Sequence, residues 1–95
     1  MPTYVSLLRF SDQGARGIKK STSRASAFRR AARKAGVTIQ AQLWTLGAWD
    51  GLLVLSADND KKILHCLSEL AAAGFVRTQT MPAFDESEFR AIVAK

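Results

Sequence analysis

The sequence predicts an α+β domain in which two helices cover one face of a four-stranded antiparallel sheet, in the order βαββαβ with a short C-terminal helix. Two observations support this fold class. The hydrophobic spacing alternates along the chain between strand-like runs and a helical period, and glycines at positions 36 and 74 stand where the two predicted helices end. A chain of 95 residues suits one domain, so residues 1–95 are expected to form a single unit.

The chain begins with a predicted central strand. Residues 3–10 (TYVSLLRF) are rich in β-branched, aromatic and aliphatic types and carry apolar groups on both faces. Ser11 or Asp12 can cap a short helical turn that runs to about Lys19.

A longer helix is predicted to end at Ala35, with Ser21 or Ser23 as its N-cap. Gly36 follows in the position that favours a left-handed C-cap residue. Small and aromatic residues repeat at helical spacing and form the face that packs closely on the sheet: Phe28, Ala31, Ala32 and Ala35.

The middle of the chain predicts two strands joined by a hairpin. Residues 37–44 alternate with a period of two, which places Val37, Ile39, Ala41 and Leu43 on one face and Thr38, Gln40, Gln42 and Trp44 on the other. Residues 46–51 (LGAWDG) interrupt this strand with glycine. The aliphatic run 52–57 then resumes as a buried strand.

A second helix is predicted after Asp58 or Asn59, either of which can cap it, and it ends at Gly74. Its apolar face is expected to consist of Ile63, Leu64, Leu67, Leu70 and Ala71. This helix is expected to pack beside the first one.

The chain closes with a strand and a short helix. Residues 75–81 (FVRTQTM) form the strand, which Pro82 is expected to end. Asp85 followed by Glu88 resembles a capping box and starts a helix that carries Phe89, Ile92 and Val93.

This element order is the split βαβ, or ferredoxin-like, arrangement. Right-handed crossovers place both long helices on the same face of the sheet and leave the other face uncovered. We expect the uncovered face to carry Trp44, the neighbouring Trp49 and Tyr4 or Leu8. An exposed apolar patch of that kind marks an interface. The sequence therefore predicts a homodimer formed sheet to sheet, which can assemble further through its helical face.

Three stretches of the chain resemble the GYD domain family: MPTYVSLLRFSDQGARGIK, AGVTIQAQLWTLGAWDGLLVL and GFVRTQTMPAFD. That family is similar to the dimeric α/β barrels, in which two ferredoxin-like protomers pack their open sheet faces into a shared barrel. The resemblance implies this fold and a homodimer, and it implies no particular biochemical role. Where the family signature has Tyr before Asp, this chain has Trp49 before Asp50, and an indole N–H can only donate a hydrogen bond.

The hairpin segment Trp49-Asp50-Gly51 is the leading candidate for a site, because it would lie at the mouth of such a barrel. In that interpretation Asp50 is a base or a hydrogen-bonding group beside an aromatic wall, which makes it the candidate catalytic residue. The alternative is structural: Asp50 makes a turn with its own backbone, Gly51 supplies an unusual φ, and Trp49 packs on a neighbour.

Other polar residues are expected on the open face, where they can line a cavity between two sheets: Gln40, Gln42, Arg77, Gln79 and Arg9. The first four of these, together with Tyr4, Trp44, Trp49 and Asp50, form the candidate ligand-binding set. A hydrogen-bond network between two copies explains the same residues, because buried polar groups need partners with or without a ligand. The weak alternation of the last strand leaves open whether Arg77 or Thr78 faces inward.

The remaining reactive side chains favour structural roles. His65 and Cys66 are adjacent on a helix, so their side chains point about 100° apart and do not form a nucleophile–base pair. His65 is expected at the surface, with an axial haem ligand as the alternative implied by the superfamily, and Cys66 is expected to be half-buried. If Met1 were removed, the Pro2 amine would be the N-terminus and could act as a catalytic base, as in tautomerases. The rest of the chain resembles the GYD family and not a tautomerase, so this role is not predicted. One cysteine and one histidine cannot complete a zinc site, and no metal or cofactor is predicted.

The distribution of charge along the chain limits which classes of partner the sequence predicts. Residues 1–36 hold nine basic side chains and one acidic one, whereas residues 37–95 hold five and seven. A basic helix can attract polyanions. RNA-recognition domains with this topology, however, stack bases on aromatic residues of their central strands, and residues 52–55 contain none. Nucleic-acid binding is therefore disfavoured. The N-terminus shows no export signal and no apolar run approaches the ~20 residues of a membrane span, so a cytoplasmic protein without membrane contact is expected.

The function predicted from these features is small-molecule binding, or another non-catalytic role, by a dimeric α/β barrel. One alternative is a small enzyme, monooxygenase-like or isomerase-like and either cofactor-independent or haem-assisted, with its site inside the barrel. A second alternative is the binding of a polyanion or nucleic acid through the basic first helix. A fold of this kind does not by itself decide among them.

Overall fold

The computed structural model describes residues 1–94 and has the predicted element order. The elements are β1 (Thr3–Phe10), α1 (Asp12–Arg16), the 3-10 turn η1 (Ile18–Lys20), α2 (Ser21–Lys34), β2 (Thr38–Trp44), β3 (Gly51–Ser56), α3 (Asp60–Ala72), β4 (Val76–Ala83) and α4 (Glu86–Val93). No helix within residues 1–94 is both long and apolar enough to cross a membrane.

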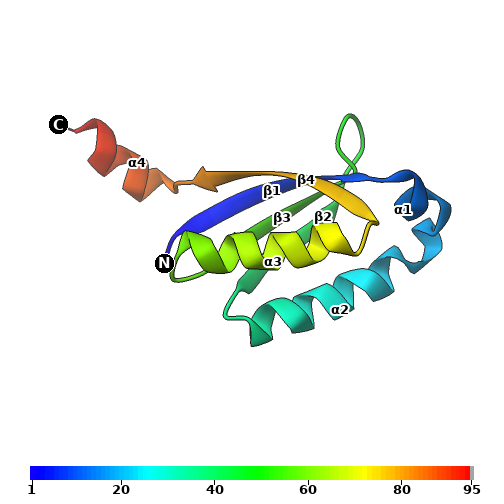
Figure 1. Cartoon of the computed structure of the whole chain (residues 1–95). Helices are drawn as coiled ribbons and strands as arrows, with labels where there is room; N and C mark the ends of the chain where they lie inside the picture. The colour runs from blue at the N-terminus through cyan, green and yellow to red at the C-terminus, as the bar shows by residue number, and fades with distance from the viewer. Residues whose placement is uncertain (95) are drawn as a thin grey trace.

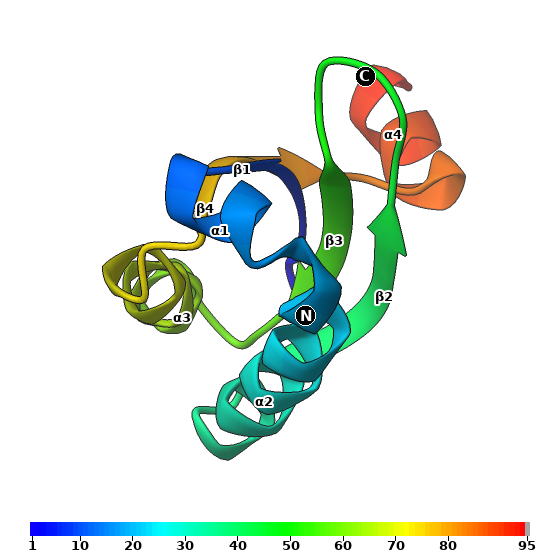
Figure 2. The same ribbon diagram turned by 90° about the vertical axis from the view of Figure 1, so that its right-hand side faces the viewer.

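The strands form one antiparallel sheet in the order β2-β3-β1-β4, so β1 is an interior strand as predicted. Figure 1 and Figure 2 show α2 and α3 on the same face of this sheet. The fold is therefore α+β and ferredoxin-like, and the sheet face opposite α2 and α3 is called the open face below.

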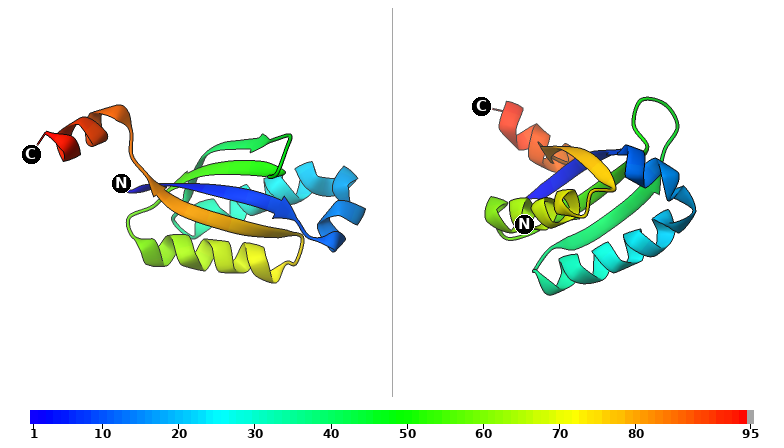
Figure 3. Two further views of the ribbon diagram at one scale, coloured as in Figure 1. Left: turned by 90° about the horizontal axis from the view of Figure 1, so that it is seen from above. Right: turned by 45° about the vertical axis from the view of Figure 1, so that its right-hand side comes forward.

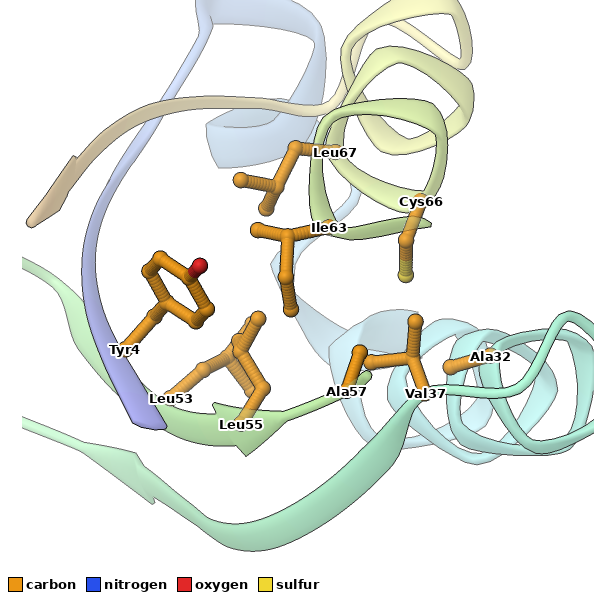
Figure 4. Packing of buried hydrophobic residues seen from close by; sticks show 9 residues of the cluster. All are labelled: Tyr4, Ala32, Val37, Leu53, Leu55, Ala57, Ile63, Cys66 and Leu67. Atoms are coloured by element: carbon orange, nitrogen blue, oxygen red, sulfur yellow. The ribbon is translucent and has the colours of Figure 1, made fainter. Parts of the chain in front are cut away.

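The core lies between the sheet and the two helices, and its buried residues are Tyr4, Ala32, Val37, Leu53, Leu55, Ala57, Ile63, Cys66 and Leu67 (Figure 4). Leu53 and Leu55 of β3 are 0% exposed, and burying one such side chain stabilises the fold by about 1.5–3 kcal/mol. The Tyr4 hydroxyl donates a hydrogen bond to the Asp60 carboxylate at the start of α3. The expectation that Tyr4 or Leu8 lies on the open face is wrong, because Tyr4 is in this core and Leu8 packs against it.

The buried face of α3 differs from the predicted one at Leu64 and Ala71, which are both exposed, and at Cys66, which is buried. Ile63, Cys66 and Leu67 are buried, whereas Leu64 is 67% exposed. The helix is rotated so that Cys66 takes the place expected for Leu64, and Cys66 is buried rather than half-buried.

The helix ends follow the sequence signals with one exception. Gly36 and Gly74 have φ of +84° and +86° at the ends of α2 and α3, as predicted. Ser11 caps α1, Asn59 caps α3, and Asp85 forms a capping box with Glu88 at α4, all as predicted.

The exception is the start of α2, where neither predicted serine is the cap. The N-cap residue is Lys20, which makes no side-chain capping bond. The Ser21 hydroxyl instead accepts a hydrogen bond of 3.0 Å from Trp44 Nε1 on β2. A contact between distant segments has replaced the local one that the sequence suggested.

A β-bulge in β2 changes which side chains share a face. Ile39 pairs with Leu55, but Ala41 pairs with Val54, so Gln40 is an extra residue in the ladder. One inserted residue moves every later side chain of the strand to the opposite face of the sheet. Ala41 and Leu43 therefore lie on the open face, and Gln42 and Trp44 lie on the helix side, which corrects the predicted alternation.

Strand β4 extends beyond its predicted end. It continues through Pro82 to Ala83 and pairs with β1 over its whole length. Because β4 is an edge strand, a proline that lacks an N–H can be accommodated without losing a bond inside the sheet.

Helix α4 projects past the end of the sheet, as Figure 1 and Figure 3 show. In Figure 2 it lies across the sheet from α2 and α3. Its apolar residues Phe89, Ile92 and Val93 are 59%, 51% and 57% exposed, and Phe84 before it is 60% exposed. This amphipathic helix therefore has a water-exposed apolar side.

Candidate functional site

The β2–β3 hairpin is fixed to β1 by Asp50. One carboxylate oxygen of Asp50 accepts a hydrogen bond of 2.8 Å from the Phe10 N–H. The Asp50 N–H donates to the Leu8 carbonyl at 2.8 Å, and its carbonyl accepts from the Thr45 N–H at 3.0 Å. Asp50 therefore bonds to β1 and not only within its own turn, and the residue with positive φ in the hairpin is Gly47 rather than Gly51.

A cationic cluster lies beside this hairpin on the open face. The Arg9 guanidinium stacks on the Trp49 ring at 4.5 Å, and its Nε donates to the Ala48 carbonyl at 3.1 Å. Arg77 is the residue of β4 directly opposite Arg9, and both side chains are exposed. Trp49 thus packs on a neighbouring side chain, and the β4 pairing places Arg77, not Thr78, on the open face.

Apolar side chains make up most of the remaining open face, with Gln79 of β4 as a polar residue opposite Leu7. The strand pairings place Val5, Leu7, Leu52, Val54, Leu43 and Met81 together there. Leu43 is 56% exposed and Met81 36% exposed. The apolar character predicted for this face is therefore present, although it comes from these six residues and not from the expected Trp44 and Tyr4; Trp49 lies beside it, against Arg9.

A cavity of about 390 Å³ lies on the other side of the sheet, between α2 and α3, at the end where Asp50 fixes the hairpin. Most of its lining is apolar, including Leu8, Phe10, Phe28, Leu53, Leu70 and Phe75. Its volume falls in the range of about 300–1,000 Å³ that is typical of small-molecule sites. This cavity lies within one protomer, whereas the sequence predicted a cavity between two sheets.

Most polar groups around this cavity already have partners. Arg29 donates to the Gln42 side chain, and Trp44 donates to Ser21. Arg24 stacks on the Phe75 ring at 4.3 Å and donates to the Gly17 carbonyl at 3.0 Å. The arrangement can hold an apolar molecule, with polar groups concentrated at its edge.

The structure divides the predicted ligand-binding set among three places. Gln42, Trp44 and Asp50 line the cavity on the helix side. Gln40, Arg77, Gln79 and Trp49 do not line it: Gln40 donates to Ser56 at 3.2 Å, and the pairings place Arg77 and Gln79 on the open face. Tyr4 belongs to the core.

Sequence reasoning missed Arg24, Phe28 and Phe75 as cavity residues. The sequence pattern assigns Phe28 to helix packing and counts Arg24 among the basic residues of a helix that can attract polyanions. The bulge at Gln40 is the missing information, because it turns Gln42 and Trp44 toward the same cavity.

His65 and Cys66 are not among the residues that line this cavity. The His65 side chain is 65% exposed and its Nε2 lies 3.9 Å from a Glu69 carboxylate oxygen, which agrees with the predicted surface position. Burial raises the pKa of the Cys66 thiol, which disfavours the reactive thiolate.

Comparison with known proteins identifies the family. The sequence matches the GYD domain over residues 4–93. The chain belongs to the GYD domain family. A relative from Thermus thermophilus, named "Glutamine synthetase and cystathionine beta-lyase binding protein", is 31% identical over 84 residues, which cover 87% of this chain and 88% of that protein. The crystal structure of TTHA0845, also from Thermus thermophilus, matches with a TM-score of 0.56 at 18% identity, covering 90% of this chain and 95% of that one, and supports the fold.

Replacing Asp50 tests whether this GYD domain uses the residue structurally. Asp50→Ala leaves the Phe10 N–H without its acceptor, and we expect the free energy of unfolding to fall by about 1–3 kcal/mol. Asp50→Asn keeps an oxygen acceptor and should retain most of that stability. Urea unfolding measures both.

Asp58→Ala is the control, because Asp58 makes an exposed ion pair with Lys62 at 3.2 Å. An exposed pair contributes at most about 1 kcal/mol. Equal stability of Asp50→Ala and the unaltered chain would contradict the structural role.

Proposed function

We propose that this GYD domain is a non-catalytic homodimer that binds metabolic enzymes of the glutamine synthetase or cystathionine β-lyase type. The observation that carries the proposal is the likeness to the Thermus thermophilus protein named for binding those two enzymes, which extends over most of both chains. The fold alone would carry no such assignment.

The homodimer is supported by the composition of the open face. Its apolar residues come from all four strands, Gln79 is a polar residue among them, and Leu43 at one edge is more than half exposed. Contiguous apolar patches on soluble proteins mark interaction sites. A second copy with the same face supplies a complementary apolar surface, as in an isologous two-fold interface.

Helix α2 is the surface we propose for enzyme binding. When two open faces cover each other, the helices point outward. The sequence of α2 contains five basic residues and no acidic one, and Arg30, Arg33 and Lys34 are exposed. Such a helix favours an acidic patch on the partner and accelerates association at low salt.

A charge placed on the open face should separate the dimer. Leu43→Asp leaves the protomer core intact, because Leu43 is already 56% exposed, but it buries a carboxylate in the dimer interface, which is costly. We expect a shift from dimer to monomer in size-exclusion chromatography with light scattering. Leu64→Asp is the control, since Leu64 is 67% exposed on α3 in the helix layer. If both variants keep the mass of the unaltered chain, the interface is elsewhere.

Enzyme binding can be measured directly with purified components. The immobilised chain is titrated with the glutamine synthetase and the cystathionine β-lyase of Thermus thermophilus, with that organism's own binding protein as the positive control. We expect binding to at least one enzyme, weakened by Arg30→Glu with Arg33→Glu and by added salt. Lys61→Glu on α3 is the matched control and should have little effect. Failure to bind either enzyme, while the positive control binds, would contradict the proposal.

A second candidate function, small-molecule binding, is favoured by the cavity between α2 and α3. The cavity has about 390 Å³ of space and a mostly apolar lining. Cavities of this kind take up apolar ligands by removing their surface from water. This candidate differs from the sequence-based one in its location, since the ligand would lie inside one protomer and not between two sheets.

Filling the cavity tests this second candidate. Ala31 lines the cavity and is exposed on α2, so Ala31→Trp should occupy its space without disturbing the core. With the fluorescent probe 1-anilinonaphthalene-8-sulfonate, we expect the unaltered chain to bind and Ala31→Trp to lose most of that binding. Ala72→Trp, at an exposed position of α3 outside the lining, is the control. Equal probe binding by all three proteins would exclude the cavity as the site.

A further inference from the structure

We infer that α4 is an arm that packs on the hairpin of a second copy and so closes the dimer at both ends. This inference rests on the proposed homodimer and specifies how the two copies are oriented. The partner of α4 is a second copy of this chain, which α4 contacts at the hairpin segment 45–50.

The first support is the pair of arginines at one end of the open face. Arg9 and Arg77 are directly opposite each other in the β1–β4 ladder, and both are exposed. Like charges directly opposite each other in a sheet are destabilising. Carboxylates from a partner would relieve this repulsion.

The second support is the acidic start of α4 at the other end of the sheet. Asp85, Glu86 and Glu88 lie in or just before its first turn, and Arg90 is the basic residue of the helix. Ala83, which leads into α4, pairs with Thr3 at the start of β1, whereas Arg77 pairs with Arg9 near the end of β1. Each open face therefore has a positive end and leads into a negative arm at the opposite end.

This charge distribution selects one of two dimer orientations. A two-fold axis parallel to the strands would bring arm to arm and arginine pair to arginine pair. A two-fold axis across the strands brings each acidic arm to the arginine pair of the other copy. Like-charge contacts across an interface are costly, so the second orientation is favoured.

The register of the sheet then places the arm. When this two-fold axis crosses the middle of β1, the β1 strands of the two copies run in opposite directions, and Thr3 of one copy lies over Phe10 of the other. Ala83 pairs with Thr3 and Val76 pairs with Phe10, so Ala83 of one copy is level with Val76 of the other. The chain beyond Ala83 continues past the end of the partner's sheet, at the end where Arg9 contacts the hairpin residues Ala48 and Trp49.

Apolar groups at this place complete the match. Leu46 in the hairpin is 101% exposed, and the hairpin also carries Trp49. Phe89, Ile92 and Val93 form an i, i+3, i+4 face on α4 that is more than half exposed. Packing α4 of one copy on the hairpin of the other removes both apolar surfaces from water.

Cross-linking tests this arrangement. The variant Ala48→Cys with Ala91→Cys places one thiol on the hairpin and one on α4, both at exposed positions. The hairpin and α4 lie at opposite ends of the sheet in one protomer, so a short bismaleimide joins the two positions only between two copies. We expect a covalent dimer on a denaturing gel. Cys66 is buried, and the unaltered chain controls for its reactivity.

The matched control is Ala72→Cys with Ala91→Cys, since Ala72 is exposed at the hairpin end of the sheet but on α3 in the helix layer. Its cross-linked yield should be lower by about tenfold or more, because no contact holds those thiols at high effective concentration. Equal yields from the two pairs would show that the cross-link does not depend on the hairpin position and would overturn the inference.

Failure of the inference and failure of the homodimer are distinguishable. A protein that is dimeric by light scattering but gives no cross-link from the Ala48→Cys, Ala91→Cys pair retains the sheet-to-sheet dimer and rules out the arm. A monomer by light scattering overturns both.

Discussion

A four-stranded sheet with both of its helices on one face cannot shield its other face from water. Right-handed crossovers impose this imbalance on the βαββαβ order. On the covered face, Leu53 and Leu55 are fully buried, whereas on the open face Leu43 of β2 remains 56% exposed. The free energy available from covering that face, about 25 cal/mol per Å² of apolar surface, is what makes a second copy the expected partner. The proposed outward position of α2 and the proposed role of α4 both follow from that pairing.

The end of the sheet near Asp50 is organised by two local features. The bulge at Gln40 turns Gln42 and Trp44 toward α2, where Arg29 and Ser21 bind them. Asp50 ties the hairpin to the backbone of Phe10. Together they leave a cavity on the helix side and an arginine pair on the open face. The hairpin that carries the family signature therefore separates two surfaces of different character, one suited to apolar molecules and one to a negatively charged partner.

The elements and their order were predictable because each depends on local signals: the alternation around Ile39, the cap at Asn59 and the capping box at Asp85. The faces of β2 were not predictable, since a bulge leaves no hydrophobic signature and reverses the facing of every later residue in the strand. Tyr4 was a candidate for the open face because its strand carries apolar groups on both faces, whereas the structure places it on the helix side, where it contacts Asp60, 56 positions away in the chain. Among the candidate site residues, Asp50 was found by its motif, while Arg24 and Phe75 meet only through tertiary packing.

The central claim is that a second copy of this chain covers the open face. Sedimentation equilibrium of the unaltered protein at micromolar concentration tests it most directly, because the measured mass needs no assumption about shape. The account predicts a particle of twice the 10.4 kDa chain mass, or an even multiple of it. A single species of 10.4 kDa across that concentration range would contradict it.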